Sequence, residues 1–281
     1  MPPIIRDLRT DQVLVVLHSV HSDQGVVSAA EQLVAGDAQL RYLRVVPRAA
    51  PFTMSMFRQP LLAAPTGGSG LPIRLVTAGD DMATTILDLT RELKITLLAL
   101  GEPPGDKRRA ELIRRVLSRV LASTSAPVLF VPAGAKERRD PIRRILLVLH
   151  QPYPAMDLVH LAIPLARRNH AELRILTLPS ATPFIPDLPP VGTVHPSLVC
   201  RAFDAGAWLE RECARQGYRT RAVSSEGKGA KAIVDIAATL EADLVLADAG
   251  LAEIRVGWRR RKALDLLFPR LPCPLLLGRC A

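Results

Sequence analysis

Val13–His18 reads VLVVLH, and Ile145–His150 reads ILLVLH. Each stretch is a short apolar run that ends abruptly on a histidine, and the two histidines lie 132 positions apart. The same offset places Tyr42–Pro47 on Arg174–Pro179, proline on proline. Because self-similarity at a fixed offset is typical of repeated architectures, the sequence predicts one fold written twice.

The later part of each copy repeats at a different offset. Ile86–Leu89 corresponds to Ile233–Ile236, and Ala126–Leu129 corresponds to Cys273–Leu276, both at 147 positions. The difference between 147 and 132 is 15 residues, which places an insertion in the second copy between Pro179 and about Thr220. We therefore expect the two copies to differ mainly in one connection.

The length fits two ordinary domains. The chain has 281 residues, 48% of them hydrophobic, and each copy lies within the usual domain size of ~100–150 residues. We expect domains at 8–133 and 142–281, joined by a small, charged linker at 134–141. No apolar run approaches the ~20 residues that span a bilayer, and no charged-then-apolar leader opens the sequence, so we expect a cytoplasmic protein.

Apolar runs alternate with helix-period stretches in both copies. Runs of Val, Leu and Ile without polar alternation favour strands that are covered on both faces, as in a parallel sheet between helix layers. The sequence therefore predicts an α/β fold with two tandem, doubly wound, five-stranded parallel sheets flanked by helices. The predicted strands are 13–17, 40–46, 73–77, 96–100 and 127–131 in the first copy and 143–149, 172–178, 219–224, 243–247 and 274–278 in the second; the predicted helices are 25–34, 81–93, 107–122, 157–168, 197–216, 230–240 and 259–268.

Two features separate the copies further. Pro47–Pro72 is rich in proline and glycine where the second copy has a helical pattern, which predicts a mobile loop or flap. All four cysteines, Cys200, Cys213, Cys273 and Cys280, lie in the second copy without metal-ligand spacing. We expect reduced, mostly buried thiols and no metal site.

Three places in the chain resemble the universal stress protein family, whose members often occur as tandem pairs. The first is strand one, which ends in a short polar turn before a helix. The second is Val76–Asp80, which leads through a helix to Leu97–Gly101, and the third is the closing strand Ala126–Val131 with its second-copy form Pro272–Leu277. The resemblance covers nearly the whole chain. It implies the adenine-nucleotide α-hydrolase-like fold, in which ligands bind beyond the carboxyl ends of the strands where the strand order reverses.

Nucleotide-binding members of that family carry an aspartate after strand one and, after strand four, Gly-x-x-Gly followed nine residues later by Gly-Ser or Gly-Thr. Glycines let backbone N–H groups surround phosphates. Little of this pattern survives here, which indicates degenerate nucleotide sites. In the first copy the aspartate position holds His18, the first glycine is kept as Gly101, the second falls on Pro104 beside Gly105, and the Gly-Ser pair falls on Arg114-Arg115. In the second copy the same positions hold His150, Asp248, Leu251 beside Gly250, and Arg261-Lys262.

The paired cations have two interpretations. They can form a solvated helix face, with Glu111 one turn from Arg114 and Arg115. Alternatively they hold an anion or an acidic protein surface where backbone would hold phosphate. In the second copy the run Arg259–Lys262 contains no acidic residue. Asp265 is the only acidic residue in the helix predicted there.

The histidines and one loop add further candidates. His18 and His150 have two interpretations. Either they point toward the ligand crevice, where a histidine can stack on a base or titrate near neutral pH, or they hydrogen-bond to a nearby loop without a role. The loop Ser224–Lys231 contains Gly227 and Lys228 before a helix, so it either caps that helix or binds an anion. The candidate ligand positions are His18, Gly101, Gly105, Arg114, Arg115, His150, Gly227, Lys228, Arg261 and Lys262.

The net charge of the chain indicates which kind of partner it binds. A net charge of +10 and a pI near 10.1 favour anionic partners, while 4% aromatic content and the absence of nucleic-acid motifs argue against specific nucleic-acid recognition. No catalytic motif stands out, so we expect a non-enzymatic stress-response regulator that binds a protein or an anionic ligand. No cofactor is required by the pattern. The alternatives are true ATP or adenine-nucleotide binding by the first domain, and an adaptor that docks on an acidic partner such as a transporter's cytoplasmic domain. We expect the two copies to form an intramolecular pseudo-dimer through Val128–Val131 and Leu275–Gly278. A homodimer of the whole chain is the further option.

Overall fold

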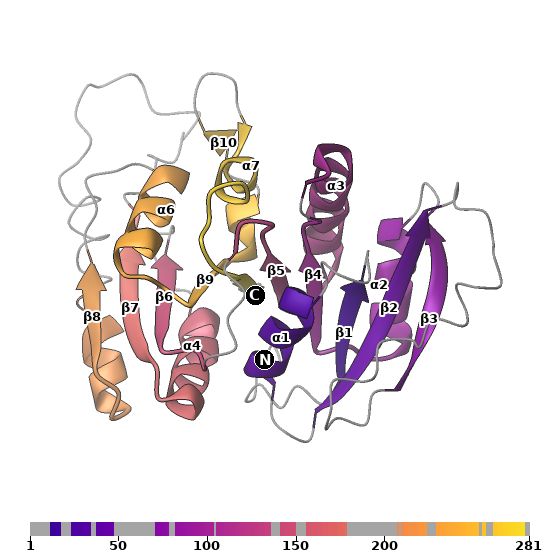
Figure 1. Cartoon of the computed structure of the whole chain (residues 1–281). Coiled ribbons are helices and arrows are strands. Elements are labelled where there is room, and N and C mark those ends of the chain that lie inside the picture. Colours follow the sequence, from indigo (N-terminus) through magenta and orange to yellow (C-terminus); the bar gives the residue numbers. More distant parts are fainter. Residues whose placement is uncertain are drawn as a thin grey trace, which may run out of the picture. The chain divides into compact units, whose positions relative to one another are not determined.

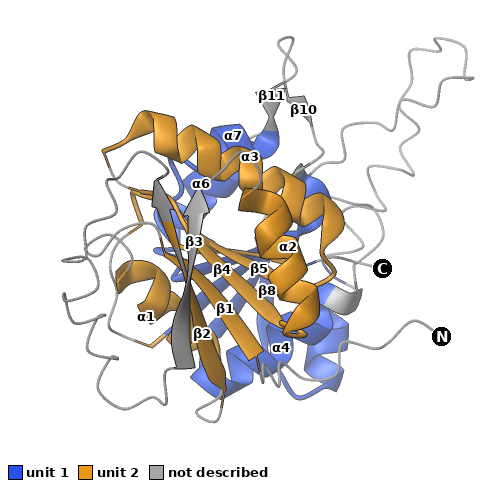
Figure 2. Cartoon of the chain, turned by 90° about the vertical axis from the view of Figure 1, so that its right-hand side faces the viewer, with its two compact units in different colours: residues 1–7, 142–273, 278–281 blue, residues 8–141, 274–277 orange. Residues whose placement is uncertain are grey.

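The chain folds into two compact units in a computed structural model, coloured separately in Figure 2. Unit 2 spans Leu8–Pro141 together with Pro274–Leu277, and unit 1 spans Ile142–Cys273 together with Gly278–Ala281 and the first seven residues. The structure describes residues 12–17, 24–34, 38–47, 71–78, 82–103, 105–135, 141–149, 156–178, 207, 209–223, 229–252, 255–256 and 261–278. The Pro47–Pro72 loop predicted above lies outside them between 48 and 70.

Unit 2 contains a sheet whose strand order is β3-β2-β1-β4-β5-β12 (Figure 1). Strands β1 to β5 are parallel, and β12 pairs antiparallel with β5. The elements are β1 (Gln12–Leu17), α1 (Gln24–Leu33), β2 (Gln39–Pro47), β3 (Leu71–Ala78), α2 (Met82–Glu92), β4 (Leu97–Gly101), α3 (Lys107–Ser123), β5 (Val128–Val131) and β12 (Leu275–Gly278).

Helices cover both faces of this sheet, with α1 on one side and α2 and α3 together on the other (Figure 2). Because both faces are covered, β4 and β5 are buried at every position. The inner face of α3 follows the helical period, and its buried residues are Ala110, Ile113, Val116, Leu117, Val120 and Leu121.

Unit 1 repeats the parallel order in β8-β7-β6-β9. Helices α6 and α7 pack against each other, and residues 209–215 are helical between β7 and β8. The α/β fold class predicted from the apolar runs is confirmed. The elements are β6 (Arg144–Leu149), α4 (Met156–Asn169), β7 (Glu172–Thr177), β8 (Thr220–Val223), α6 (Ala230–Thr239), β9 (Leu244–Asp248), the 3₁₀ turn η2 (Ala249–Ala252), β10 (Arg255–Val256), β11 (Arg261–Lys262) and α7 (Ala263–Leu267).

The predicted helix 259–268 is wrong at Arg261 and Lys262, while residues 259 and 260 lie outside the described residues. Arg261 and Lys262 form the short strand β11, which pairs antiparallel with β10, and the helix begins only at Ala263. The antiparallel pairing with Arg255 and Val256 holds Arg261 and Lys262 in an extended conformation.

The two units share backbone details beyond strand order. Val13 aligns with Leu97 in unit 2, and Ile145 aligns with Leu244 in unit 1, as the offsets of 132 and 147 require. Lys94 and Glu241, also 147 apart, both adopt positive φ, at 49° and 46°, just after the helix that precedes the fourth strand. Few residues other than glycine take this conformation, so its recurrence at matching places indicates the same helix-ending turn.

The second strand departs from the sequence offset by one residue. Val16 pairs with Leu43, whereas Val148, 132 residues after Val16, pairs with Leu176, 133 residues after Leu43. The alignment of proline on proline is therefore one residue out of step with the sheet. Pairing, which decides the face on which each side chain lies, overrides the sequence match.

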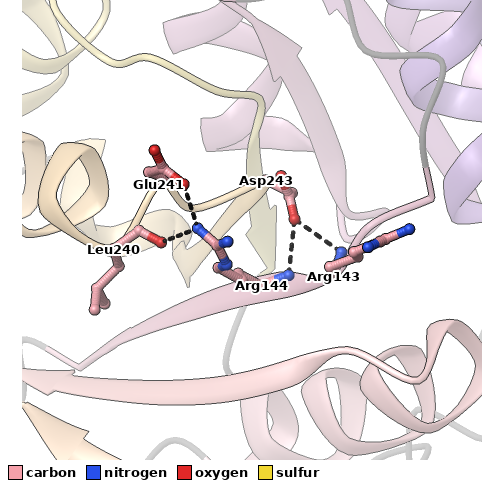
Figure 3. A network of polar contacts seen from close by, with 5 residues as sticks. All are labelled: Arg143, Arg144, Leu240, Glu241 and Asp243. Atoms are coloured by element: carbon pink, nitrogen blue, oxygen red, sulfur yellow. Dashed lines mark hydrogen bonds and ion pairs between the residues drawn. The ribbon is translucent and has the colours of Figure 1, made fainter.

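A polar network fixes the start of β6 in unit 1 (Figure 3). The buried carboxylate of Asp243 accepts hydrogen bonds from the backbone N–H groups of Arg143 and Arg144, both at 2.8 Å. The Arg144 side chain points the other way and donates to the Leu240 carbonyl and to Glu241. In unit 2 the place of Asp243 is taken by Thr96, whose hydroxyl donates to the Gln12 carbonyl at 2.9 Å.

The second-copy thiols were expected to be reduced and buried. Cys213 and Cys273 are both free and buried, which confirms the prediction for these two, while Cys200 and Cys280 lie outside the described residues. Burial raises the pKa of the Cys213 thiol and of the nearby Tyr218 hydroxyl, which donates to the Ala171 carbonyl. Among the described helices, none combines the length and apolar character that crossing a bilayer requires.

Candidate functional site

The candidate site lies where the strand order reverses in each unit. In unit 2 the chain runs from β1 outward through β2 and β3, then returns to β4 on the other side of β1, so the reversal falls between the ends of β1 and β4. In unit 1 it falls between the ends of β6 and β9. In parallel sheets this is where helix N-termini and loop amides gather, so it is the expected ligand position.

Gly101 ends β4 at the reversal of unit 2. A methyl group placed there would lie 2.2 Å from Val26 Cγ2 of α1, closer than any real contact. Helix α1 therefore packs directly onto the backbone of β4, and only glycine permits this approach. The glycine is required by packing within the unit, whatever it does for a ligand.

Gly105 and Asp106 shape the entry to α3. Gly105 has φ +77°, and a methyl group added to it would meet nothing within 4 Å, so its role is to make the turn. Asp106 is the N-cap of α3, and its carboxylate accepts the backbone N–H of Arg109 at 3.0 Å. A protein carboxylate thus already takes an N–H group that a phosphate would use.

Glu102 and Arg114 form the main polar contact of this site. The Glu102 side chain is 3% exposed, and its Oε1 accepts a hydrogen bond from Arg114 Nη2. Its Oε2 accepts the backbone N–H of Ala133 at 3.3 Å, just after β5. The Glu102 backbone N–H in turn donates to the Val131 carbonyl at 2.8 Å. One buried acid thus joins the end of β4, helix α3 and the turn after β5.

The two arginines of the predicted cation pair have different partners. Arg115 pairs with Glu111 on the exposed face of α3, as the solvated-face interpretation predicted. Arg114 does not share that acid, because it lies on the inner side of the helix and pairs with Glu102 instead. Both cations of the pair are therefore already matched with a carboxylate of the chain.

Asp248 takes the place of Gly101 in unit 1. It is the last residue of β9, is 6% exposed, and its carboxylate accepts the backbone N–H of Gly250 at 2.6 Å. The following residues turn immediately as η2. The end of the fourth strand therefore presents a buried negative charge in this unit too, and one loop amide is already bound to it.

The remaining predicted positions fall outside the side chains that the structure describes. His18 and His150 directly follow Leu17 and Leu149, the last residues of β1 and β6, and lie outside the described residues. Gly227 and Lys228 precede Gly229, the N-cap of α6 with φ 62°. Arg261 and Lys262 are described as backbone only, in β11. Their proposed ligand roles stay predictions.

Sequence reasoning missed Glu102, the acid that organises unit 2. A signal was present, because Arg114 falls on the same helical face as the buried residues Ala110, Ile113 and Leu117. A cation on an apolar face requires a buried acid. The one directly after the apolar strand β4 was the natural candidate.

Residues 141–266 of the chain match the model of the universal stress protein family. No curated protein matches the sequence.

Solved structures match over nearly the whole chain. A universal stress protein from Archaeoglobus fulgidus is 14% identical to this chain. The match covers 95% of this chain and 96% of that protein, with a TM-score of 0.63. A functionally unknown protein from Pseudomonas aeruginosa is 14% identical, covers 96% and 93%, and has a TM-score of 0.62. Identities this low establish the fold alone. A shorter match, with 13% identity over 49% of this chain and 98% of its own, is an A. fulgidus universal stress protein in complex with dAMP; its TM-score is 0.34.

Proposed function

We propose that the protein is a non-enzymatic regulator of the universal stress type, with two tandem domains whose nucleotide sites are degenerate, acting by binding a protein or an anionic ligand. The tandem arrangement is supported by the strand order shared by the two units and by the positive φ at both Lys94 and Glu241. The cytoplasmic location and the lack of catalysis stay predictions from the sequence.

The observation that carries this proposal is a buried acid at the end of the fourth strand in both units. Glu102 directly follows β4, and Asp248 ends β9. A phosphate placed beside either carboxylate would meet like charge in a position shielded from water, where repulsion is stronger than in bulk solvent. The N–H groups of Arg109, Ala133 and Gly250 already donate to carboxylates of the chain.

The alternative that unit 2 binds ATP rests on its two glycines. Each has a structural explanation, because Gly101 is needed by the packing of Val26 and Gly105 by its positive φ. The adaptor alternative rests on the basic run before α7, whose Arg259 and Arg260 lie outside the described residues. The structure adds nothing in its favour.

Calorimetric titration with Mg-ATP tests the proposal directly. We expect no saturable heat, and no nucleotide released from the purified protein on denaturation and mass spectrometry. A Kd in the micromolar range, or a stoichiometric co-purified adenine nucleotide, would contradict the proposal. The variants Arg259→Glu, Arg260→Glu and Arg261→Glu combined serve as the separate test of an acidic protein partner, because they alter the basic run and leave the fourth strands untouched.

A further inference from the structure

The Glu102 carboxylate lies among donors from two separate elements of unit 2. Arg114 Nη2 reaches it from α3, and the Ala133 amide reaches it from the turn after β5 at 3.3 Å. A guanidinium and a backbone N–H converging on one oxyanion are the usual parts of a carboxylate or phosphate site. Here the oxyanion is a side chain of the protein itself.

One donor of this site is left without an acceptor in the part of the chain that the structure describes. Arg114 Nε is buried and has no hydrogen-bond partner among the described residues, although a guanidinium presents its donors as a fork that fits two oxygens. The Arg114 side chain keeps 25% of its surface exposed, so solvent reaches part of it. Because the Glu102 carboxylate bonds to Arg114 through Nη2, the Nε side of the guanidinium binds no oxygen of Glu102.

We propose that Arg114 and the Ala133 amide form an oxyanion site in unit 2, and that the Glu102 carboxylate fills it as an internal ligand. The site is of the chemical class that binds a free carboxylate or a phosphate group. This inference rests on the proposed function and deepens it, because it names what occupies the end of β4 where a ligand phosphate would be excluded.

A purely structural ion pair makes a different prediction. Removing one member of a buried pair leaves an uncompensated charge, which destabilises a protein strongly. In a closed structural pair the loss is permanent. In an oxyanion site, a small anion from solution takes the vacated place, restores the charge balance and stabilises the native state by mass action.

The experiment is anion rescue of Glu102→Ala in the full chain. Thermal unfolding is followed in sodium chloride and in increasing sodium formate, sodium phosphate or Mg-ATP at constant ionic strength. We expect the variant to have a lower Tm than the wild type in chloride. Formate or phosphate should restore about half or more of that Tm difference, and the effect should saturate as the anion concentration rises. The wild type, with its site filled, should show no such anion-specific shift.

Two matched variants separate the site from general salt effects. Glu102→Gln removes the charge but keeps an amide in the same space, so it should lose stability without being rescued. The double variant Glu102→Ala with Arg114→Met removes the cation as well, so its Tm should not respond to formate. Where Glu102→Ala does not fold in chloride, the refolded fraction in formate replaces Tm as the readout.

The anions distinguish the ligand. Rescue by formate and phosphate but not by ATP supports a small oxyanion site, and additional rescue by ATP supports a site that takes the phosphate of a nucleotide. Absence of rescue by every anion, or equal rescue of the double variant, overturns the inference. ATP binding by the wild type overturns the proposed function instead, so the two failures are distinguishable.

Discussion

Replacement of Asp243 by alanine should cost unit 1 about 3–4 kcal/mol of unfolding free energy. The carboxylate is buried and accepts two backbone hydrogen bonds, from Arg143 and Arg144, at 2.8 Å each (Figure 3). A hydrogen bond to a charged group contributes about 1.5–3 kcal/mol, and the lower part of the summed range applies because both amides are only partly buried, so water replaces some of the loss. Asp243→Asn, which keeps one oxygen acceptor, should cost about half as much.

The same network supplies its own control. The Arg144 side chain pairs with Glu241, and the two side chains are 45% and 71% exposed. Exposed ion pairs contribute about 0–1 kcal/mol to stability. Arg144→Ala should therefore cost far less than Asp243→Ala, although each change removes a contact of Arg144. Thr96→Ala, at the matching place of unit 2, removes two neutral hydrogen bonds to the backbone of Gln12, one of them long at 3.4 Å, and should cost about 1 kcal/mol.

Urea unfolding followed by circular dichroism measures these losses, and hydrogen exchange of the peptide containing the amides of Arg143 and Arg144 localises them. Exchange there should accelerate in Asp243→Ala and stay unchanged in Arg144→Ala. A loss below about 0.5 kcal/mol for Asp243→Ala, or an equal loss for Arg144→Ala, would refute the assignment of the stabilisation to the two backbone hydrogen bonds.

Unit 2 and the buried thiol of unit 1 give three further predictions. Gly101→Ala should cost about 1–3 kcal/mol because its methyl meets Val26 at 2.2 Å, and a double-mutant cycle with Val26→Ala should recover most of that loss; additive losses would contradict the close packing. Asp106→Ala should lower the Tm through loss of about 1 kcal/mol of capping energy, whereas Asp106→Asn should be nearly neutral in the same melting experiment. Stability should hold up to the ordinary thiol pKa of about 8.5 and fall as pH rises beyond it, because burial raises the pKa of Cys213 and Tyr218 and the native state keeps protons that the unfolded chain releases; urea midpoints of Cys213→Ala between pH 7 and 10 should decline less steeply than those of the wild type.

The strands were predictable because their signal is local. Runs such as Val13–Leu17 and Leu97–Leu100 are apolar at every position, and a chain segment of this kind has few destinations other than a sheet covered on both faces. The helices of unit 2 were predictable for a similar reason, since the apolar face of α3 repeats at helical spacing. The fold class follows from their alternation.

The contacts at the candidate site were not predictable in the same way. Sequence spacing gave Glu111 as the partner of both Arg114 and Arg115, because neighbours one helical turn apart are visible in the sequence. The acid that pairs with Arg114 is Glu102, which belongs to another element and is brought there only by the packing of α3 on the sheet. Likewise, the strand β11 at Arg261 and Lys262 depends on a partner strand at Arg255 and Val256 that no local pattern reveals.

The pairing of β12 with β5 has a consequence for the order in which the protein is built on the ribosome. Leu275, Leu276 and Leu277 align with Phe130, Leu129 and Val128, so the sheet of unit 2 is completed by a strand synthesised after almost the whole of unit 1. Until then β5 has an open edge, which is the kind of surface on which other strands aggregate. Nascent chains halted before residue 275 should therefore occupy chaperones longer than released full-length chains do.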